Sequence, residues 1–338
     1  MDGVFVHESL LQQAEDDQIR CNVCARRCLL APHEIGWCRT REHDGSRLVT
    51  RTYGAISSLE SAPIEKQSFY HFYPGTRALT AGSWSCNLGC PWCENWEISH
   101  VAPPSEGDYI SPERFVGWAE GSDCQGVCLS FNEPTLSLEW AIDVFEIARP
   151  RGLYNTFITN GYMTPESLEL LVEAGLDALN VDIKGDAATV AQFCQGDAEM
   201  AWAICKLAAK CGVHVEVSTL IIPTINDSTI ILRDIAERLL RELGPEVPWH
   251  LKGYSPAYLF DLPATPRASL ESAWTTGEQA RLEYVYIDNV PGHRNANTHC
   301  PECDALLIRR LGADVLLNAL RNGACPECKH LIPGVWNR

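Results

Sequence analysis

The chain has 338 residues, a formal net charge of −17 and the composition of an ordinary globular protein. This charge argues against a broad nucleic-acid surface, because nucleic-acid affinity rests largely on Lys and Arg contacts to phosphate. No apolar run reaches the ~18 residues of a membrane span. The first residues lack the basic start and apolar core of a signal peptide. We therefore expect a cytoplasmic protein with neither a membrane nor a nucleic acid as partner.

Residues 1–50 form a predicted N-terminal module that is rich in cysteine. Sixteen cysteines in a chain without an export signal, several of them in CxxC spacing, indicate metal binding rather than disulfides. Four thiolates this close in sequence could bind zinc, or an iron–sulfur cluster in which every iron has a protein ligand. Their spacing does not decide between the two. The candidate ligands are Cys21, Cys24, Cys28 and Cys38.

Residues 51–295 form the predicted core, in which strands alternate with helix-length segments. Such alternation predicts repeated β/α units and a parallel sheet. We therefore expect an α/β fold, a partial (β/α)6 TIM-like barrel with small metal-binding modules at both ends. The expected strands cover residues 78–85, 126–131, 156–159, 178–183, 213–222, 249–254 and 284–287.

Several residues mark where helices of this core begin and end. Thr164 is a good N-cap, Pro165 suits the first helical position, and Gly175 suits the position after the last turn. A helix is also expected over residues 137–148. Either Asp227 or Ser228 is expected to cap an amphipathic helix that runs to about residue 243.

A loop with three cysteines follows the first of these strands. Cys86, Cys90 and Cys93, which we call the triad, are spaced C-x3-C-x2-C, and the next cysteine is Cys124. A cubane iron–sulfur cluster takes four ligands, so three thiolates could seat three irons and leave the fourth open to a small molecule. An open coordination position distinguishes a catalytic metal site from a structural one. The alternatives are a zinc knuckle that lacks a ligand, or merely buried cysteines.

Polar residues stand at the ends of several expected strands, where parallel α/β sheets carry their ligands. We expect these ends to converge on the triad loop, although residues at strand ends also serve simply as turns and caps. The residues concerned are Asn132-Glu133, Thr159-Asn160-Gly161, Asp182 with Lys184, and Ser255.

Residues 296–338 form a predicted C-terminal module with two CPxC knuckles. Four thiolates in two such pairs match a structural zinc ribbon, which we favour over a rubredoxin-like iron site with the same ligands. Glycine often follows the second cysteine of such a knuckle, but Asp304 and Lys329 stand here, so we expect strained turns. The candidate ligands are Cys300, Cys303, Cys325 and Cys328. The scattered Cys124, Cys128, Cys194, Cys205 and Cys211 are expected to be small core residues.

The triad spacing, with the aromatic Trp92 before the last cysteine, resembles the signature of the radical S-adenosylmethionine (SAM) superfamily. Nearly the whole chain is similar to the AmmeMemoRadiSam-system radical SAM enzymes, which are related to the pyruvate formate-lyase activating enzymes. The segments that carry this resemblance are Pro63-Ile64-Glu65-Lys66, Phe69 to Gly75, Asn95-Trp96, Asn132-Glu133-Pro134-Thr135, Thr159-Asn160-Gly161-Tyr162, Asn180 to Gly185 and Leu220-Ile221-Ile222-Pro223.

The resemblance implies an enzyme, oxidoreductase-like or activase-like, that reductively cleaves SAM at a [4Fe–4S] cluster. The resulting 5′-deoxyadenosyl radical would abstract hydrogen from an unknown substrate, either a protein or a small molecule. The triad would ligate the cluster, Trp92 would lie near the adenine, Asn132 and Glu133 would lie against the SAM amino group, and Asn160, Asp182 and Lys184 would line the pocket. A low-potential electron donor such as flavodoxin or ferredoxin would be a partner.

The chain also departs from the family pattern. Asn132 replaces the glycine of a Gly-Glu-Pro motif, and Ile158 stands where the activating enzymes have an acidic residue, which puts a cation site like theirs in doubt. Glu94 replaces an expected Gln, and its charge would oppose cluster reduction if it were buried. The alternative function is a non-catalytic metal-binding scaffold or an electron carrier that uses the four-cysteine sites.

Overall fold

The computed structural model of the protein describes residues 5–336 and divides into two compact units. The first unit consists of the described residues up to Ala62 together with Arg77–Leu179. The second consists of Pro63–Thr76 and the residues from Asn180 onward. Each unit is thus assembled from two separate stretches of chain.

The first unit begins with two small antiparallel sheets that hold the N-terminal cysteines. Their strand orders are β1-β6-β5 and β2-β3-β4. The strands are β1 (His7–Glu8), β2 (Gln12–Glu15), β3 (Gln18–Cys21), β4 (Leu29–Leu30), β5 (Arg41–His43) and β6 (Leu48–Thr50). Their short lengths explain why hydrophobic periodicity did not reveal them.

The first unit also contains the β/α units that precede residue 180. The hydrogen-bonded order is β7-β8-β9-β10-β11, and the β8–β9 and β9–β10 pairs are parallel. These strands are β7 (Ser58–Pro63), β8 (Arg77–Gly82), β9 (Gly126–Leu129), β10 (Tyr154–Thr159) and β11 (Ala178–Asp182). The last residue of β7 and the last three residues of β11 belong to the second unit. The helices are α1 (Trp96–Ser99), α2 (Pro112–Gly121), α3 (Leu138–Ala148) and α4 (Pro165–Ala174), with 3-10 turns at Pro134–Ser137 and Arg149–Arg151.

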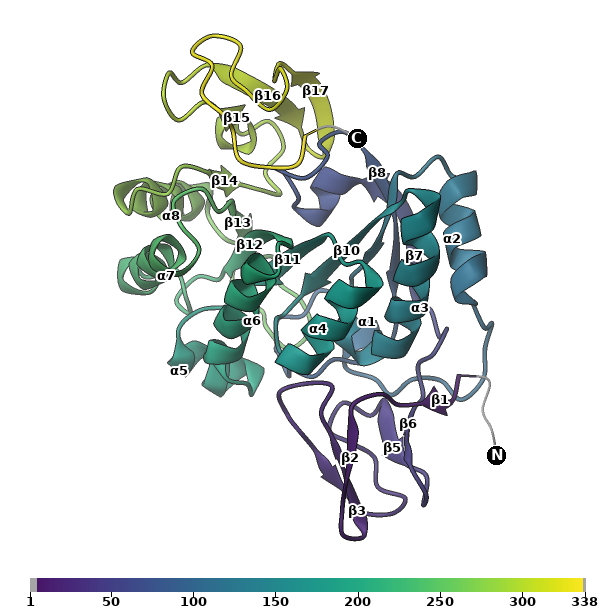
Figure 1. The fold of residues 1–338 in the computed structure, drawn as a ribbon. Helices are drawn as coiled ribbons and strands as arrows, with labels where there is room; N and C mark the ends of the chain where they lie inside the picture. Colours follow the sequence, from purple (N-terminus) through teal and green to yellow (C-terminus); the bar gives the residue numbers. More distant parts are fainter. Residues whose placement is uncertain (1–4, 337–338) are drawn as a thin grey trace. The chain divides into compact units, whose positions relative to one another are not determined.

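Helices α2, α3 and α4 lie side by side along these strands (Figure 1). Thr164 caps α4 by accepting a hydrogen bond from the backbone N–H of Ser167, and Gly175 ends it at a φ of 109°. The buried face of α4 includes Leu168 and Leu171. The helix is therefore the one that its capping residues predicted.

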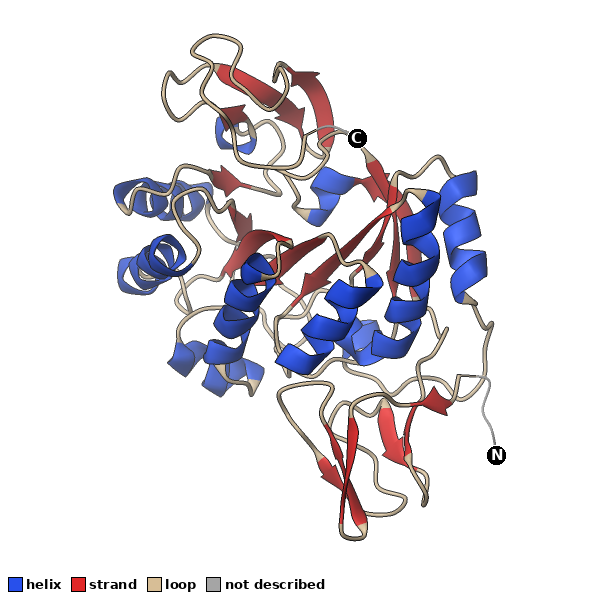
Figure 2. Ribbon diagram, viewed as in Figure 1, coloured by secondary structure: helices blue, strands red, loops and turns tan. Residues whose placement is uncertain are grey.

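The second unit continues the alternation of strands and helices, as the colours of Figure 2 make clear. Strands β12 (His214–Ile221), β13 (Trp249–Gly253) and β14 (Val285–Ile287) are parallel neighbours in that order. The helices are α5 (Ala187–Thr189), α6 (Ala198–Lys210), α7 (Thr229–Glu242) and α8 (Arg267–Gln279), with a π-helical turn at Val190–Cys194 and 3-10 turns at Ile64–Gln67 and Arg294–Ala296. Ser228, one of the two expected residues, caps α7.

A small antiparallel sheet closes the second unit. It consists of β15 (Thr298–His299), β16 (Leu306–Leu311) and β17 (Asp314–Asn318). Its apolar residues share a hydrophobic cluster with Tyr70, Tyr284 and Tyr286 of the same unit. The C-terminal cysteines therefore lie in turns beside a sheet that packs on the 63–76 segment and on β14.

A fully buried carboxylate, Glu216 on β12, ties the second unit together. It accepts hydrogen bonds from the backbone N–H groups of Tyr70 (3.0 Å) and His71 (2.8 Å). The Nε2 atoms of His214 and His250 lie 2.9 Å and 2.6 Å from its oxygens. Burial pushes the pKa of Glu216 up, but the hydrogen bonds from the two histidines outweigh it and hold that pKa well below its ordinary value.

The observed fold confirms the α/β prediction and its partial (β/α) barrel, because every expected core strand is present within one or two residues of its middle. Helices α2, α6 and α8 were not predicted individually. Of the five scattered cysteines, Cys211 is exposed, so its assignment as a core residue was wrong, while the other four are buried as expected. Within residues 5–336, no helix is long and apolar enough to cross a membrane.

Candidate functional site

The triad loop follows β8, and the ends of β9 and β10 lie beside it. Ala81 of β8 pairs with Leu129 of β9, which pairs with Phe157 of β10, so the three strands end at one edge of the sheet. Gly126 allows this close pairing, because a Cβ there would lie 1.9 Å from the ring of Tyr154. The predicted convergence of these three strand ends is therefore observed within the first unit.

Asn132, at the end of β9, holds the start of the loop. Its side-chain oxygen accepts a hydrogen bond from Ser83 N at 2.9 Å, and its Nδ2 donates to Ser85 O at 2.9 Å. An asparagine does both because its amide carries a donor and an acceptor. A glycine at this position, as in the usual family motif, could make neither side-chain contact.

The sulfur of Cys86 receives two N–H groups. Leu88 N lies 3.4 Å from it and Asn160 Nδ2 lies 3.5 Å from it. Such donors stabilise a thiolate and tune a cluster that it ligates. Cys90 is buried, whereas Cys86 and Cys93 are partly exposed. The loop therefore presents three thiols, one of them already surrounded by the donors that an iron–sulfur ligand uses.

Glu133 is buried at the end of β9 and its carboxylate accepts four hydrogen bonds. Oε1 accepts from Thr135 N, Thr135 Oγ1 and Thr159 Oγ1 at 3.0, 2.5 and 2.8 Å, and Oε2 accepts from Asn160 N at 2.9 Å. Burial raises the pKa of Glu133 above its ordinary value, and these donors offset part of that rise. Glu133, Asn160 and Cys86 thus form one connected group, in which Oε2 has only a single donor.

Thr135 was not identified as a site residue from the sequence, and Thr159 was noted only as a residue at a strand end. Both occur in motifs that carried the family resemblance, and a hydroxyl two residues after a carboxylate is a common turn partner. The contact of Thr159 with Glu133 spans 26 positions. It depends on the register of β9 against β10, which the sequence does not state.

The remaining predicted site residues have defined surroundings. Trp92 is buried in the triad loop, with an exposed fraction of 4%. Glu94 is exposed, which answers the question that the sequence left open about its charge. In the second unit, Lys184 Nζ lies 3.1 Å from Asp182 Oδ2, so these two residues form an ion pair with each other.

The N-terminal cysteines line a pocket in the first unit. Cys21, Cys24 and Cys38 are buried and Cys28 is partly exposed, and Arg26 and Arg41 lie along the same pocket. Two contacts join this module to the triad loop. Ser85 Oγ donates to Cys38 O at 2.5 Å, and Arg26 Nε donates to Asn87 O at 2.9 Å.

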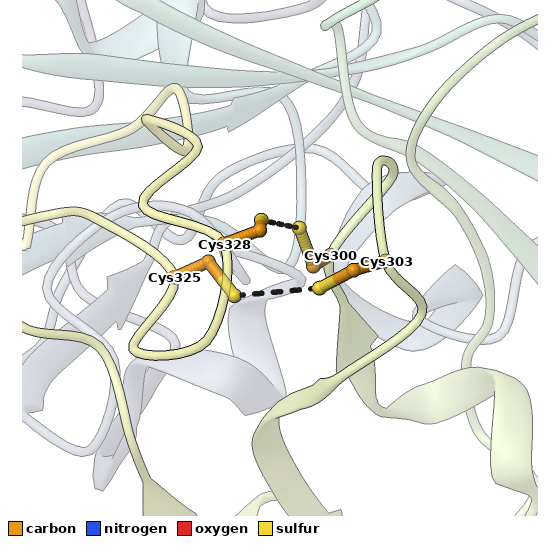
Figure 3. A group of neighbouring side chains, drawn as sticks. All are labelled: Cys300, Cys303, Cys325 and Cys328. Atoms are coloured by element: carbon orange, nitrogen blue, oxygen red, sulfur yellow. Dashed lines mark hydrogen bonds between the residues drawn. The ribbon is translucent and has the colours of Figure 1, made fainter.

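The four C-terminal cysteines face one another in the second unit (Figure 3). Their sulfurs all lie within 4.8 Å of one another, with 3.5 Å between Cys300 and Cys328 and 3.7 Å between Cys303 and Cys325. Four thiolates around one zinc ion, with Zn–S bonds near 2.3 Å, lie about 3.8 Å apart in a tetrahedron. The group therefore has the spacing of a single tetrahedral metal ion.

The knuckles of this site have the backbone strain that the sequence predicted. Asp304 and Lys329 follow the second cysteine of each knuckle and have φ values of 57° and 68°. The backbone N–H of Cys328 is the main cause that lowers the pKa of Cys325 to about 7, whereas burial raises the pKa of Cys300 to about 12.

We expect replacement of the exposed Cys303 and Cys328 by serine to remove about one equivalent of metal per chain. It should also unfold the C-terminal sheet at a lower temperature, because the binding free energy of a structural metal is part of the folding free energy. Metal analysis and a thermal melt measure the two effects. Cys211→Ser, which changes an exposed thiol elsewhere in the same unit, is the control. Full metal content in the double variant would contradict the assignment of these ligands.

Comparison with known proteins gives a family match and a similar protein. Residues 85–234 match the family described as the Radical SAM superfamily. The chain is 41% identical over 302 residues to the uncharacterized protein MJ0808 of Methanocaldococcus jannaschii, covering 88% of this chain and 90% of that protein.

Two solved structures share the fold at low sequence identity. A radical SAM methyltransferase from Sphaerobacter thermophilus is similar with a TM-score of 0.50 and 14% identity, covering 64% of this chain and 68% of that chain. Streptococcus suis SuiB bound to S-adenosylmethionine is similar with a TM-score of 0.50 and 12% identity, covering 67% of this chain and 53% of that chain.

Proposed function

The chain belongs to the radical SAM superfamily, and from this premise we propose that it reductively cleaves SAM and abstracts a hydrogen atom from a substrate. The observation that carries the proposal is the connected group at the ends of β8, β9 and β10. There, Cys86 receives N–H groups from Leu88 and Asn160, and Asn160 in turn donates its backbone N–H to Glu133. Three thiols and a buried carboxylate at one sheet edge suit a cluster beside a cationic co-substrate.

The residues of the triad loop fit a [4Fe–4S] cluster with one open iron. Cys86, Cys90 and Cys93 would ligate three irons, and the cluster, when bound, supplies the electron that cleaves SAM. Asn132 keeps the loop entrance fixed through Ser83 and Ser85. Asn160 positions Cys86 and Glu133 together. Because Glu94 is exposed, water screens its charge and it opposes cluster reduction only weakly.

The contacts with SAM follow from the charges of the site. Oε2 of Glu133 has one hydrogen-bond donor and can accept another from the SAM ammonium, while Oε1 already accepts three from Thr135 and Thr159. We assign Asn132 to the same end of SAM and Trp92 to the adenine. Asp182 and Lys184, as a polar pair on β11 and its following loop, are assigned to the SAM or substrate pocket.

The substrate remains of two classes, a protein, as in glycyl-radical activation, or a small molecule. The electron would come from a low-potential donor such as flavodoxin or ferredoxin, and zinc is the proposed metal of the C-terminal site. A cytoplasmic location suits the oxygen sensitivity of such a cluster. The alternative, a scaffold or an electron carrier, gives no role to the carboxylate and the donors around Cys86.

One measurement separates these two functions. Anaerobically reconstituted protein, given dithionite and SAM, should release 5′-deoxyadenosine. A carrier or scaffold would leave SAM intact under the same conditions, and that result would overturn the proposed function.

We expect Glu133→Gln to weaken SAM binding while the cluster remains bound. The variant keeps the shape of the side chain and loses its charge, and a hydrogen bond to a charged group contributes about 1.5–3 kcal/mol, which is roughly a ten- to hundredfold change in affinity. Equilibrium binding of SAM to the reconstituted protein measures the change. Glu65→Gln, at a buried glutamate of the second unit, is the control for loss of a buried charge. Unchanged SAM affinity in Glu133→Gln would mean that Glu133 only braces the ends of β9 and β10.

A further inference from the structure

The pocket of the N-terminal cysteines contains a buried cation. Arg41 lines this pocket together with Cys21, Cys24, Cys28 and Cys38, and only 2% of its side chain is exposed. Its NH1 atom donates to Glu139 Oε1 at 2.6 Å and to Ser9 Oγ at 2.5 Å, and its NH2 atom donates to Leu136 O at 3.0 Å. The guanidinium is therefore held on its outer edge by three acceptors.

The Nε atom is the one nitrogen of this guanidinium that has no partner within the described structure. Arg41 Nε is buried and makes no hydrogen bond to the residues from 5 to 336. Arg41 lines the same pocket as Cys21 and Cys38. A buried N–H without an acceptor is costly, so this edge of Arg41 indicates that an acceptor belongs in the pocket.

The distances between the sulfurs distinguish a site for a single metal ion from a site for a cluster. A single ion draws its thiolates as close as those of the C-terminal site, where the four sulfurs lie within 4.8 Å of one another. Among residues 5–336 no other group of three or more such ligand atoms is gathered so closely, and this holds for the N-terminal cysteines and for the triad alike. A cluster holds its thiolates farther apart than one ion does, because irons and sulfides lie between them. Within the described residues, the N-terminal group therefore lacks the close spacing of a single-ion site, as the triad does.

We propose that Cys21, Cys24, Cys28 and Cys38 ligate a second iron–sulfur cluster, with Arg41 donating its Nε–H to a sulfur of that cluster. Four thiolates complete the ligand set, so this cluster has no open iron and does not bind SAM. Four thiolates carry a net negative charge into a buried pocket, and Arg41 offsets part of it. Arg41 is a positioning residue of this site rather than a ligand.

The two cluster sites lie next to each other in the first unit. Cys38 accepts a hydrogen bond through its carbonyl from Ser85, which immediately precedes Cys86. Arg26, between Cys24 and Cys28, donates to Asn87, which immediately follows Cys86. A change at the N-terminal cluster can therefore reach the triad through one backbone contact on each side of Cys86. This inference does not rest on SAM cleavage and is tested independently of it.

The test is an iron count on anaerobically reconstituted full-length protein. Two [4Fe–4S] clusters would give about eight irons and eight sulfides per chain, and Cys21→Ser with Cys24→Ser should leave about four of each. The triad variant with three alanines should also keep about four irons, and the electron paramagnetic resonance signal of its remaining cluster should not change when SAM is added. Cys128→Ala, which removes a fully buried thiol on β9, is the control and should lose no iron.

Three outcomes would overturn the second cluster. They are a triad variant without iron, an N-terminal variant that keeps all its iron, and an N-terminal variant that loses zinc instead of iron. The triad variant needs no change in the N-terminal module. Its iron content therefore tests the second cluster even if the Cys21/Cys24 variant fails to fold.

The role of Arg41 has its own readout. Arg41→Lys keeps the charge beside Glu139 but removes the Nε–H, and hydrogen bonds to the sulfurs raise the reduction potential of a cluster. The midpoint potential of the N-terminal cluster should therefore shift to more negative values, while that of the triad cluster stays unchanged. An unchanged potential of the N-terminal cluster would show that Arg41 serves only its ion pair with Glu139.

Discussion

Simultaneous replacement of Cys86, Cys90 and Cys93 by alanine should reduce the release of 5′-deoxyadenosine to the level seen without enzyme. The thiolates are the only bonds that we assign between the chain and the catalytic cluster, and without them no reductant can deliver an electron to SAM. The assay is chromatography of 5′-deoxyadenosine after incubation with dithionite and SAM, alongside an iron count.

The same variant should keep the metal of the C-terminal site, because the C-terminal sulfurs belong to the other unit and make a site of their own. Cys128→Ala serves as the matched control, since it removes a buried thiol from the same unit and should leave the activity intact. If the triple variant still formed 5′-deoxyadenosine at the normal rate, the assignment of the triad as cluster ligands would be wrong.

Glu216→Gln should lower the free energy of unfolding by about 3–5 kcal/mol, the cost of breaking a buried charged network by removing one partner. The amide has one oxygen in place of two, so its NH₂ group faces two donors, either Tyr70 N–H with His250 Nε2 or His71 N–H with His214 Nε2. Denaturant unfolding of wild type and variant under identical metal loading measures the difference. Glu237→Gln, at an exposed glutamate on α7, should change the free energy of unfolding little.

The same glutamate makes stability depend on pH in a direction that can be stated. Its pKa in the folded protein lies well below the ordinary value of 4.5, so the unfolded chain takes up a proton at a higher pH than the folded one. The stabilisation is complete above pH 4.5 and is lost as the pH falls toward the folded pKa. Glu216→Gln should lack this part of the acid sensitivity, and equal slopes for both proteins below pH 4.5 would contradict the assigned network.

How much of the fold the sequence predicts depends on how local the signals are. Helix α4 was predicted because Thr164, Pro165 and Gly175 act within the helix itself. Helix α8 begins after Pro266 with no side-chain cap, so it had no such start signal. The N-terminal sheets escaped prediction because strands of two to four residues contain too few alternations to detect.

In the candidate site, too, the residues in local motifs were predicted and the contacts between distant residues were not. The triad is a local pattern and was identified from its spacing, and so was the four-cysteine group at the C-terminus. The threonine that supports Glu133 and the histidine that supports Glu216 lie 26 and 34 positions away from their partners. Such contacts are decided by strand register and by which strands are neighbours. Arg41 and Glu139, 98 positions apart, are a further case in which neither residue carries a motif of its own.

The second unit consists of two stretches of chain that are far apart in sequence, and this has a consequence during protein synthesis. Phe69, Tyr70 and Phe72 are buried in the folded chain, but Arg310, which donates to Tyr70 O, is 240 positions further on. At ~5–20 residues per second, a ribosome needs roughly 12–50 s to reach it. The first unit has all its residues once Leu179 is made, whereas this aromatic segment must wait for partners that are made later, first Glu216 and then Arg310. The interval is long enough for chaperones to bind the segment, and slow synthesis or a break in the message beyond residue 180 should favour aggregation through it.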